Sequence, residues 1–176
     1  MISIRIHGRG GQGVKKASQI LGRAAHLAGY HTQDFALYGA ERRGAPVTSF
    51  VRIDKEEILT RGYVWEPDYI IVLDDTLELS CHLTGRKKTT KELINTNKKL
   101  ELGVEYCSVD ATGITMKEIG KNIPNVAILG AFVKIFDMIT MDNLAKAVEI
   151  ELGTKHMEAV QKNMRAAKQC YEKVKC

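Results

Sequence analysis

A strand, a glycine-rich turn and a helix follow one another at the start of the chain. Ile2, Ile4 and Ile6 alternate with polar residues, which is the period of a β-strand with one better buried face. From Val14 onward apolar residues recur at helical spacing, and Gly29 stands where a helix C-cap is expected. The chain is therefore predicted to begin with a β-strand that a tight turn joins to an α-helix.

The turn has the G-x-G-x-x-G spacing at Gly8, Gly10 and Gly13. Glycines lack a Cβ atom, so they tolerate positive φ and let backbone N–H groups approach a phosphate at the positive end of the helix. Asp34, 21 residues after Gly13, stands where an acid that binds a ribose is expected. The same glycines also suit a turn that only lets the helix pack closely on the sheet, and both interpretations stay open.

Further strands are predicted along the chain. Residues 69–74 form an apolar run that ends in an acid, which is typical of a strand buried on both faces of a parallel sheet. Residues 31–35 and 104–110 are also predicted to be strands. Residues 47–54 alternate and are rich in β-branched side chains, so we expect a strand there, at an edge of the sheet.

A helix is predicted after the buried strand. Asp75 and Thr76 are candidate N-caps. Leu77, Leu79 and Leu83 are expected on its inner side.

Residues 92–95 fit two structures. They suit a short strand, but Thr89 and Glu92 also have the spacing of a capping box at a helix start. The residues alone leave this choice open.

The last third of the chain is predicted to be helical, over residues 115–122, 126–136, 142–152 (ended by Gly153) and 156–173. Strands that alternate with helices indicate an α/β fold. We predict one domain over residues 1–176, with an open, mostly parallel Rossmann-like sheet, helices on both faces and a helical C-terminal tail.

Composition restricts the classes of protein that the chain can belong to. With 176 residues it can bury roughly 70 % of its unfolded surface in one core. It is 44 % hydrophobic and has no apolar run of membrane-spanning length, and no signal peptide precedes the first strand, so we expect a cytoplasmic protein with no membrane partner. The net charge of +5 is too small to indicate nucleic acid. The basic residues between 155 and 175 indicate either a solvated helix face or a docking surface.

The four cysteines are predicted to be free thiols. Cys81, Cys107, Cys170 and Cys176 form no C-x-x-C pair of the kind that iron–sulfur and zinc sites use. We expect Cys107 to be buried in a strand and Cys176 to be exposed at the chain end. The chain is therefore predicted to hold no metal cluster of its own.

The sequence offers no catalytic residue. No Ser or Cys lies in a nucleophile elbow. The histidines have no metal-ligand spacing; they are His7, His26, His31, His82 and His156. His7 adjoins the glycine turn, and a packing role is favoured for it.

A second motif runs from Tyr38 to Pro46 and holds Glu41, Arg42 and Arg43 between glycines. Adjacent arginines are usual in a solvated turn. However, this loop follows the second strand, so we expect it to open on the same edge of the sheet as the glycine turn. Its arginines would then offer planar donors to a carboxylate or a phosphate, with Glu41 holding one of them in place.

The two motifs together resemble the gamma subunit of the 2-oxoacid:ferredoxin oxidoreductases, most closely the pyruvate enzymes (pyruvate synthases). The resemblance extends over nearly the whole chain and includes the strand and double acid at residues 70–75, residues 109–112 and the helix start at residues 125–132. Two long motifs in this order are far more specific than a lone G-x-G-x-x-G.

The resemblance implies a role inside a larger oxidoreductase. Such complexes decarboxylate a 2-oxoacid oxidatively, with coenzyme A as the acyl acceptor and ferredoxin as the electron acceptor. It implies alpha, beta and delta subunits as partners, and it implies that those subunits hold thiamine diphosphate, Mg and the iron–sulfur clusters.

On this basis the two motifs are expected to line an intersubunit wall near the cofactor and coenzyme A sites. The residues assigned to this wall are Gly8, Arg9, Gly10, Gly11, Gln12, Gly13, Glu41, Arg42, Arg43 and Gly44. No catalytic base is carried over, because no residue matches one. Two other interpretations stay open: a free-standing NAD(P)-binding dehydrogenase, and a scaffold subunit remote from the chemistry.

Overall fold

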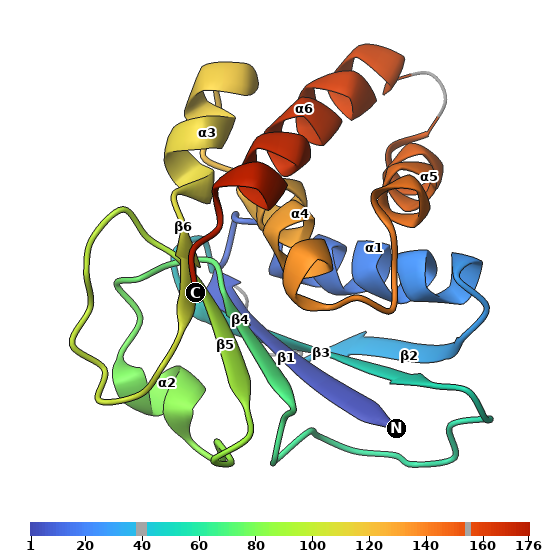
Figure 1. The fold of residues 1–176 in the computed structure, drawn as a ribbon, viewed down its shortest axis with the longest axis vertical. Coiled ribbons are helices and arrows are strands. Elements are labelled where there is room, and N and C mark those ends of the chain that lie inside the picture. The colour runs from blue at the N-terminus through green and yellow to red at the C-terminus, as the bar shows by residue number, and fades with distance from the viewer. Residues whose placement is uncertain (38–41, 154–155) are drawn as a thin grey trace.

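Strand β1 (Ile2–Arg9) lies inside a six-stranded sheet in the computed structural model, which describes residues 1–37, 42–153 and 156–176 (Figure 1). Across the sheet the order is β2 (His31–Ala36), β3 (Pro46–Asp54), β1, β4 (Tyr69–Val72), β5 (Lys91–Asn95) and β6 (Cys107–Val109). The pairs β1–β4, β4–β5 and β5–β6 are parallel, and β3 runs antiparallel to both of its neighbours. The predicted open, mostly parallel α/β sheet is confirmed.

The predicted edge position of β3 is wrong. In β3, Ile53 pairs with Ile2 of β1 on one side and with Thr32 of β2 on the other, so β2 forms the edge. The alternation in β3 has another origin, because Val51 and Ile53 join the main core while Arg52 faces the opposite side of the sheet. The alternation of apolar and polar residues along a strand therefore indicates that the two faces of the sheet differ, and does not indicate that the strand lies at an edge.

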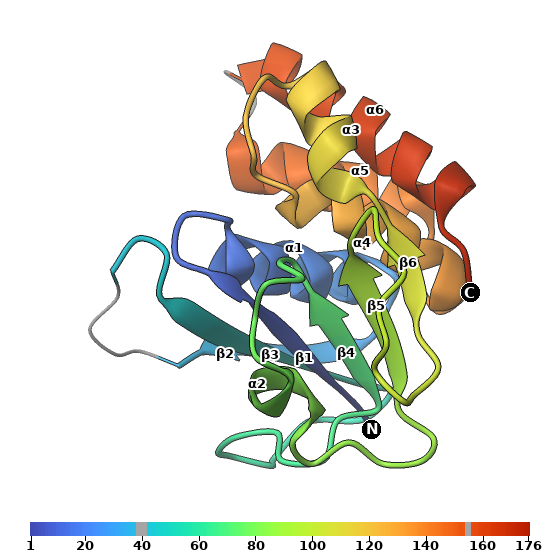
Figure 2. The same ribbon diagram turned by 90° about the vertical axis from the view of Figure 1, so that its left-hand side faces the viewer.

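The helices cover the two faces of the sheet unequally (Figure 2). One face carries α1 (Val14–Leu27), α3 (Ala111–Glu118), α4 (Asn125–Ile135), α5 (Met141–Leu152) and α6 (Met157–Lys173). The short helix α2 (Leu79–Leu83) lies over the opposite face. The described helices contain no segment that is both long and apolar enough to span a bilayer.

Helix α4 lies between the sheet and α6. On the sheet side, the ring of Phe132 packs edge-on against Tyr69 of β4 with 5.4 Å between ring centroids. On the other side, a Cβ atom at Gly130 would collide with the backbone of Ala167 in α6. Because α4 is enclosed from both sides, its residues from Asn125 to Val133 are all buried.

The helix after β4 begins later than predicted, and the predicted caps are wrong. Helix α2 begins at Leu79 with Glu78 at its N-cap, whereas Asp75 accepts a hydrogen bond from Thr96 and the Thr76 carbonyl oxygen accepts one from Arg9. Leu77 is buried as expected, but Leu79 is 45 % exposed and lies outside the core.

Strand β6 and helix α3 also differ in extent from the predictions, because α3 covers Ala111–Glu118 where residues 115–122 were predicted. Strand β6 ends at Val109 because the Asp110 carboxylate caps α3 by accepting a hydrogen bond from the Gly113 N–H at 2.7 Å. Residues 92–95, for which two structures were open, belong to strand β5.

The face of the sheet beneath α2 buries an arginine. The Arg5 guanidinium donates to the carbonyl oxygens of Trp65 at 3.3 Å, His82 at 2.8 Å and Thr84 at 2.6 Å. Burial is the main cause that lowers the Arg5 pKa, and the charge of Glu92 opposes it. Arg5 thus joins the central strand to the loop between β3 and β4, through Trp65, and to α2 and its C-cap, through His82 and Thr84.

Two histidines and a carboxylate complete this buried polar layer. The Glu92 carboxylate lies 2.6 Å from Nδ1 of His82 and is fully buried. The ring of His7 lies 6.4 Å from that of His82, and its Nδ1 is 3.2 Å from the Thr48 hydroxyl oxygen. Burial, and then the charges of Arg5 and His82, lower the pKa of His7 to about 3. His7 is therefore neutral and serves packing, as the sequence favoured.

The expectation of four free thiols is wrong for two of them. Cys107 and Cys176 form a disulfide, whereas Cys81 (exposed) and Cys170 (buried) are free. The chain end pairs antiparallel with β6 through Lys175, and this pairing brings the last residue opposite Cys107.

The close crossing of α4 and α6 predicts that Gly130→Ala destabilises the protein. Overpacking against a rigid backbone costs about 1–3 kcal/mol, which exceeds the gain in helix propensity of up to about 1 kcal/mol. The control is Gly22→Ala in α1, where the nearest atom to the new Cβ is Oδ1 of Asp34 at 3.3 Å. Urea unfolding is expected to show a loss for Gly130→Ala only. Equal stability of both variants would contradict the crossing geometry.

The low pKa of His7 predicts a specific loss of stability in mild acid. Its ordinary pKa is 6.5, so below that pH the unfolded chain takes up a proton that the folded chain excludes. The stabilisation is present above pH 6.5 and falls as the pH drops toward 3, by about 2 kcal/mol between pH 7.5 and 5.0.

His7→Gln is expected to remove this part of the pH dependence. The control variant is His31→Gln, because His31 is exposed on β2. Urea unfolding of the three proteins at pH 7.5 and 5.0 checks the prediction. If the free energy of unfolding of His7→Gln depended on pH as it does in the wild type, the His7 imidazole would not be the group whose protonation destabilises the fold.

Candidate functional site

The two motifs lie side by side at the carboxyl end of β1. The N–H of Gly10 donates to the carbonyl oxygen of Ala45 at 2.8 Å, and the N–H of Gly44 donates to that of Gly10 at 3.0 Å. The glycine turn and the second half of the arginine loop thus form one surface. Tyr38 to Glu41 lie outside the described residues, so the predicted position of Glu41 is not part of this surface as described.

The glycines of the turn are required by close packing. A Cβ atom at Gly8 would lie 2.7 Å from Cγ2 of Val14, and one at Gly10 would collide with the carbonyl oxygen of Arg42. Gly13 has φ 79° at the N-cap of α1 and packs against Asn125. Larger residues would separate the two motifs or move α1 away from the sheet.

Arg9 joins the turn to the two neighbouring loops. Its guanidinium donates to the Thr76 hydroxyl and carbonyl oxygens, both at 2.9 Å, and to the Gly44 carbonyl oxygen at 3.1 Å. Gln12 accepts from the Arg9 backbone N–H at 2.8 Å and donates to the Asp74 carboxylate at 2.6 Å. The donors of Arg9 and Gln12 therefore hold the site together.

The Asp74 carboxylate is the acceptor at the centre of these contacts. Burial acts to raise its pKa, but hydrogen bonds from Thr76 and Gln12 and the charge of Arg9 outweigh burial, so the pKa lies below its ordinary value. Asp74 is consequently ionised at neutral pH and neutralises Arg9 locally.

Arg42 and Arg43 differ from Arg9. Both are exposed, and neither forms an ion pair with any residue that the structure describes. A Cβ atom at Gly11 would lie 3.6 Å from Cγ of Arg43, so this side chain lies beside the turn. Helix α1 begins next to it with no side-chain cap and no acidic residue in its first turn. The positive helix end and two arginines thus lie on one flank.

A polar crevice of about 320 Å³ adjoins the turn at the carboxyl ends of β4 and β5. Here Asn95 donates to the Leu73 carbonyl oxygen at 2.7 Å and to the Thr112 hydroxyl at 2.8 Å, and Thr112 donates to Asn122 at 3.2 Å. Three carboxylates also line the crevice; they belong to Asp74, Asp75 and Asp110.

The sequence patterns did not indicate Asn95, Thr112 or Asn122 as site residues. The available signal was the polar residue that ends each apolar strand, since the carboxyl ends of parallel strands meet at one edge of the sheet. The ambiguous assignment of residues 92–95 concealed that signal for Asn95.

Asp34 does not lie where a ribose-binding acid would lie. Strand β3 separates β2 from β1, and the Asp34 carboxylate faces Gly22 in the middle of α1. Gly22 lies nine positions after Gly13, which corresponds to about 13 Å along the helix axis. The spacing between glycines and acid therefore does not produce a dinucleotide site in this fold.

No group of three or more His, Cys, Asp or Glu side chains within residues 1–37, 42–153 and 156–176 is arranged to hold a metal ion. The site consists of a glycine-lined turn, a positive flank and an acidic crevice. This arrangement can bind and orient an anion.

Comparison with known proteins identifies the family. The sequence profile of the family described as "Pyruvate ferredoxin/flavodoxin oxidoreductase" matches residues 3–173. Pyruvate synthase subunit PorC of Methanocaldococcus jannaschii is 43 % identical over 176 residues, which cover 99 % of this chain and 97 % of the relative. The pyruvate/ketoisovalerate oxidoreductases common subunit gamma of Pyrococcus furiosus is 40 % identical and covers 98 % of this chain and 97 % of its own.

A solved structure agrees with these relatives. The crystal structure of pyruvate oxidoreductase subunit PORC from Thermotoga maritima superposes with a TM-score of 0.85 at 38 % identity, over 99 % of this chain and 97 % of that one. Because family profile, full-length relatives and fold all coincide, the chain belongs to the pyruvate ferredoxin/flavodoxin oxidoreductase family.

Proposed function

We propose that this chain is the gamma subunit of a 2-oxoacid:ferredoxin oxidoreductase that converts pyruvate, coenzyme A and oxidised ferredoxin to acetyl-CoA, CO₂ and reduced ferredoxin. The observation that carries the proposal is full-length similarity to proteins that are named pyruvate synthase subunits. In this role the chain binds and orients and does not itself carry out the redox chemistry.

The charge distribution supports a specific orientation of the anionic substrate. The crevice is lined by three carboxylates and one lysine, Lys98, so its net negative charge would repel phosphate groups, whereas Arg42 and Arg43 and the positive end of α1 favour them. We therefore assign the phosphates of coenzyme A to the surface formed by residues 8–13 and 42–44. The two arginines supply charge-assisted hydrogen bonds, and the close packing of Gly10 keeps them at this edge.

The cofactors of the reaction are assigned to partner subunits. Thiamine diphosphate binds through Mg, which needs several oxygen ligands. The carboxylates of Asp74 and Asp75 do not fit as Mg ligands, because both already accept hydrogen bonds. Asp74 accepts them from Gln12 and Thr76, and Asp75 accepts one from Thr96. We assign thiamine diphosphate, Mg and the iron–sulfur clusters to alpha, beta and delta subunits, against which the motif surface would form one wall.

The proposal predicts that the double variant Arg42→Ala, Arg43→Ala raises the apparent KM for coenzyme A. Two charge-assisted hydrogen bonds that are partly exposed to solvent together correspond to roughly a 10- to 100-fold change. The measurement is turnover of the reconstituted complex with pyruvate and a one-electron acceptor while the coenzyme A concentration is varied. The control variant is Arg61→Ala, because Arg61 is exposed outside this surface.

Unchanged kinetics for both substrates in a fully assembled complex would contradict the binding role and favour a scaffold subunit. If the assembled complex showed no activity with any 2-oxoacid, the proposed oxidoreductase function would be contradicted. Saturable NAD or NADP binding by the isolated chain would favour a dehydrogenase instead.

Arg9→Ala is expected to behave differently from the double variant. It removes hydrogen bonds that join three loops, so the free energy of unfolding should fall by about 1–3 kcal/mol. The double variant should keep the wild-type stability, because the side chains of Arg42 and Arg43 are exposed and form no ion pair with a described residue, and the backbone bond from Ala45 to the Arg42 carbonyl oxygen is kept. Urea unfolding of the isolated subunits checks this. Equal losses in both variants would show that all three arginines are structural.

A further inference from the structure

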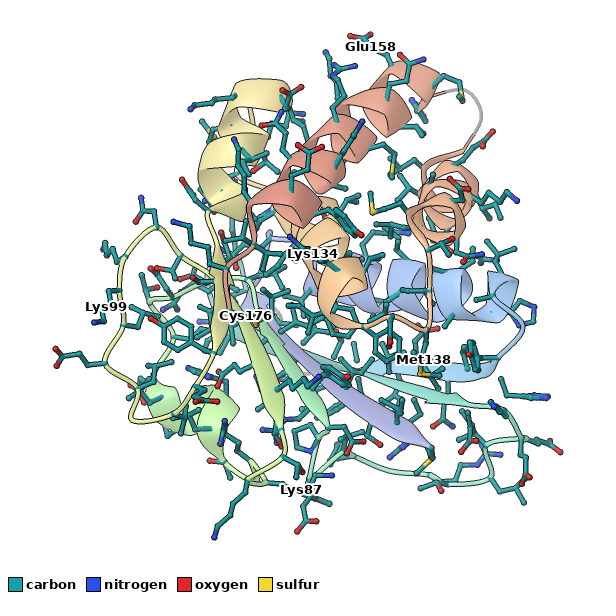
Figure 3. The ribbon with its side chains drawn as sticks, in the orientation of Figure 1. Lys87, Lys99, Lys134, Met138, Glu158 and Cys176 are labelled. Carbon is teal, nitrogen blue, oxygen red and sulfur yellow. A yellow bond between two sulfur atoms is a disulfide. The ribbon has the colours of Figure 1, made fainter. Side chains whose placement is uncertain are left out.

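The C-terminal segment, residues 174–176, is held against the edge strand β6 by backbone and covalent contacts. The Ser108 N–H donates to the Lys175 carbonyl oxygen at 2.7 Å, and the Lys175 N–H donates back to Ser108 at 3.0 Å. This antiparallel pair places Cys176 opposite Cys107, and a disulfide joins the two. Figure 3 shows Cys176 next to β6, near Lys134.

The segment forms a wall that two surface hollows share. Val174 and Cys176 line a hollow of about 820 Å³ together with Cys107. Val174 and Lys175 line a second hollow of about 840 Å³ on the carboxyl side of β6. Any release of the segment from β6 would therefore change both hollows.

The disulfide is accessible from solvent. Cys176 is exposed, Cys107 is partly buried, and the first hollow that both line is large enough to admit a tripeptide-sized reagent. The other two cysteines do not compete for this pairing. Cys81 lies in α2, over the opposite face of the sheet. Cys170 is buried, and burial is the main cause that raises the pKa of its thiol to about 12.

We propose that Cys107 and Cys176 form a reversible thiol–disulfide modification site that latches the C-terminal segment to β6. In the oxidised form the segment is fixed and completes both hollows. In the reduced form Val174 stays packed against the core and bonded to Cys170, but residues 175–176 are held only by the two Ser108–Lys175 backbone hydrogen bonds, so these last two residues detach.

Oxidation requires a low-molecular-weight disulfide, for which glutathione disulfide is the probe. The Cys176 thiolate attacks one sulfur of the reagent, the reagent's S–S bond breaks, and one glutathione thiolate leaves. The Cys107 thiolate then attacks the sulfur of Cys176 in the mixed disulfide and releases the second glutathione. Two electrons pass from the protein thiols to the reagent, and the two protein protons end on the released glutathione thiols. For reduction, one thiolate of a dithiol attacks a sulfur of the Cys107–Cys176 bond, and its second thiolate then displaces the protein thiolate, so the dithiol becomes a disulfide and both protein thiols form again.

The first experiment titrates the full-length protein in glutathione redox buffers, followed by an acid quench and mass-tagging of thiols. Cys81→Ser removes the exposed background thiol. The expected result is loss and recovery of two tags per chain in step with the buffer, with peptide mapping to Cys107 and Cys176. Two unmodified thiols at every ratio, glutathione adducts without an intrachain bond, or a disulfide that a dithiol cannot reduce in the folded protein would each overturn the proposal.

The second experiment measures amide hydrogen exchange in the oxidised and reduced protein. The amides of Ser108 and Lys175 are expected to exchange at least about tenfold faster after reduction, while those of β1 and β4 stay protected. The double variant Cys107→Ser, Cys176→Ser should match the reduced wild type and should not respond to reductant. Equal protection of Ser108 and Lys175 in both redox states would overturn the latch.

Thermal unfolding provides an independent measure. The disulfide closes a loop with a sequence separation of 69 residues, so its reduction is expected to lower Tm by about 10 °C. Cys81→Ser should keep the full redox-dependent shift. A Tm that does not change with reductant in Cys81→Ser would contradict the latch.

Discussion

The backbone pairing between Gly10 and the loop at residues 44–45 is the constraint on which the site depends. A peptide group can approach this closely only where no side chain intervenes, and Gly10 satisfies that condition. The pairing fixes two segments that are more than 30 residues apart in sequence at the start of α1. Side-chain contacts of Arg9 with Gly44 and Asp74 then join the loop after β4 to these two segments. The backbone pairing thus sets the geometry at this edge, and the side chains reinforce it.

The two faces of the sheet stabilise the fold in different ways. The helical face is filled by apolar side chains and supplies most of the hydrophobic stabilisation. The face under α2 buries Arg5, His7, His82 and Glu92, whose polar atoms join the central strands to the covering loops. Such a layer specifies one arrangement of the loops, because a misplaced loop leaves charged groups without partners.

Local patterns predicted local structure well. Ile2, Ile4 and Ile6, the glycines and the apolar run before Asp74 defined strands and turns correctly, and the parallel-sheet rule placed the two motifs at one edge. The missing information was long-range. Nothing near Arg5 or Glu92 indicates that these charged residues are buried, and the partner of Cys107 lies 69 residues away. The acidic crevice depends likewise on three separate strand ends meeting in space.

Edge strands carry unpaired peptide groups that can recruit a strand from another molecule. Beside β6 the chain end occupies this position, because Ser108 pairs with Lys175. Among the described strands, β2 is the other edge, and it pairs on one side only, with β3. The two edges of the sheet therefore differ: the chain end occupies the peptide groups of Ser108 on β6, whereas no described strand pairs with the outer side of β2.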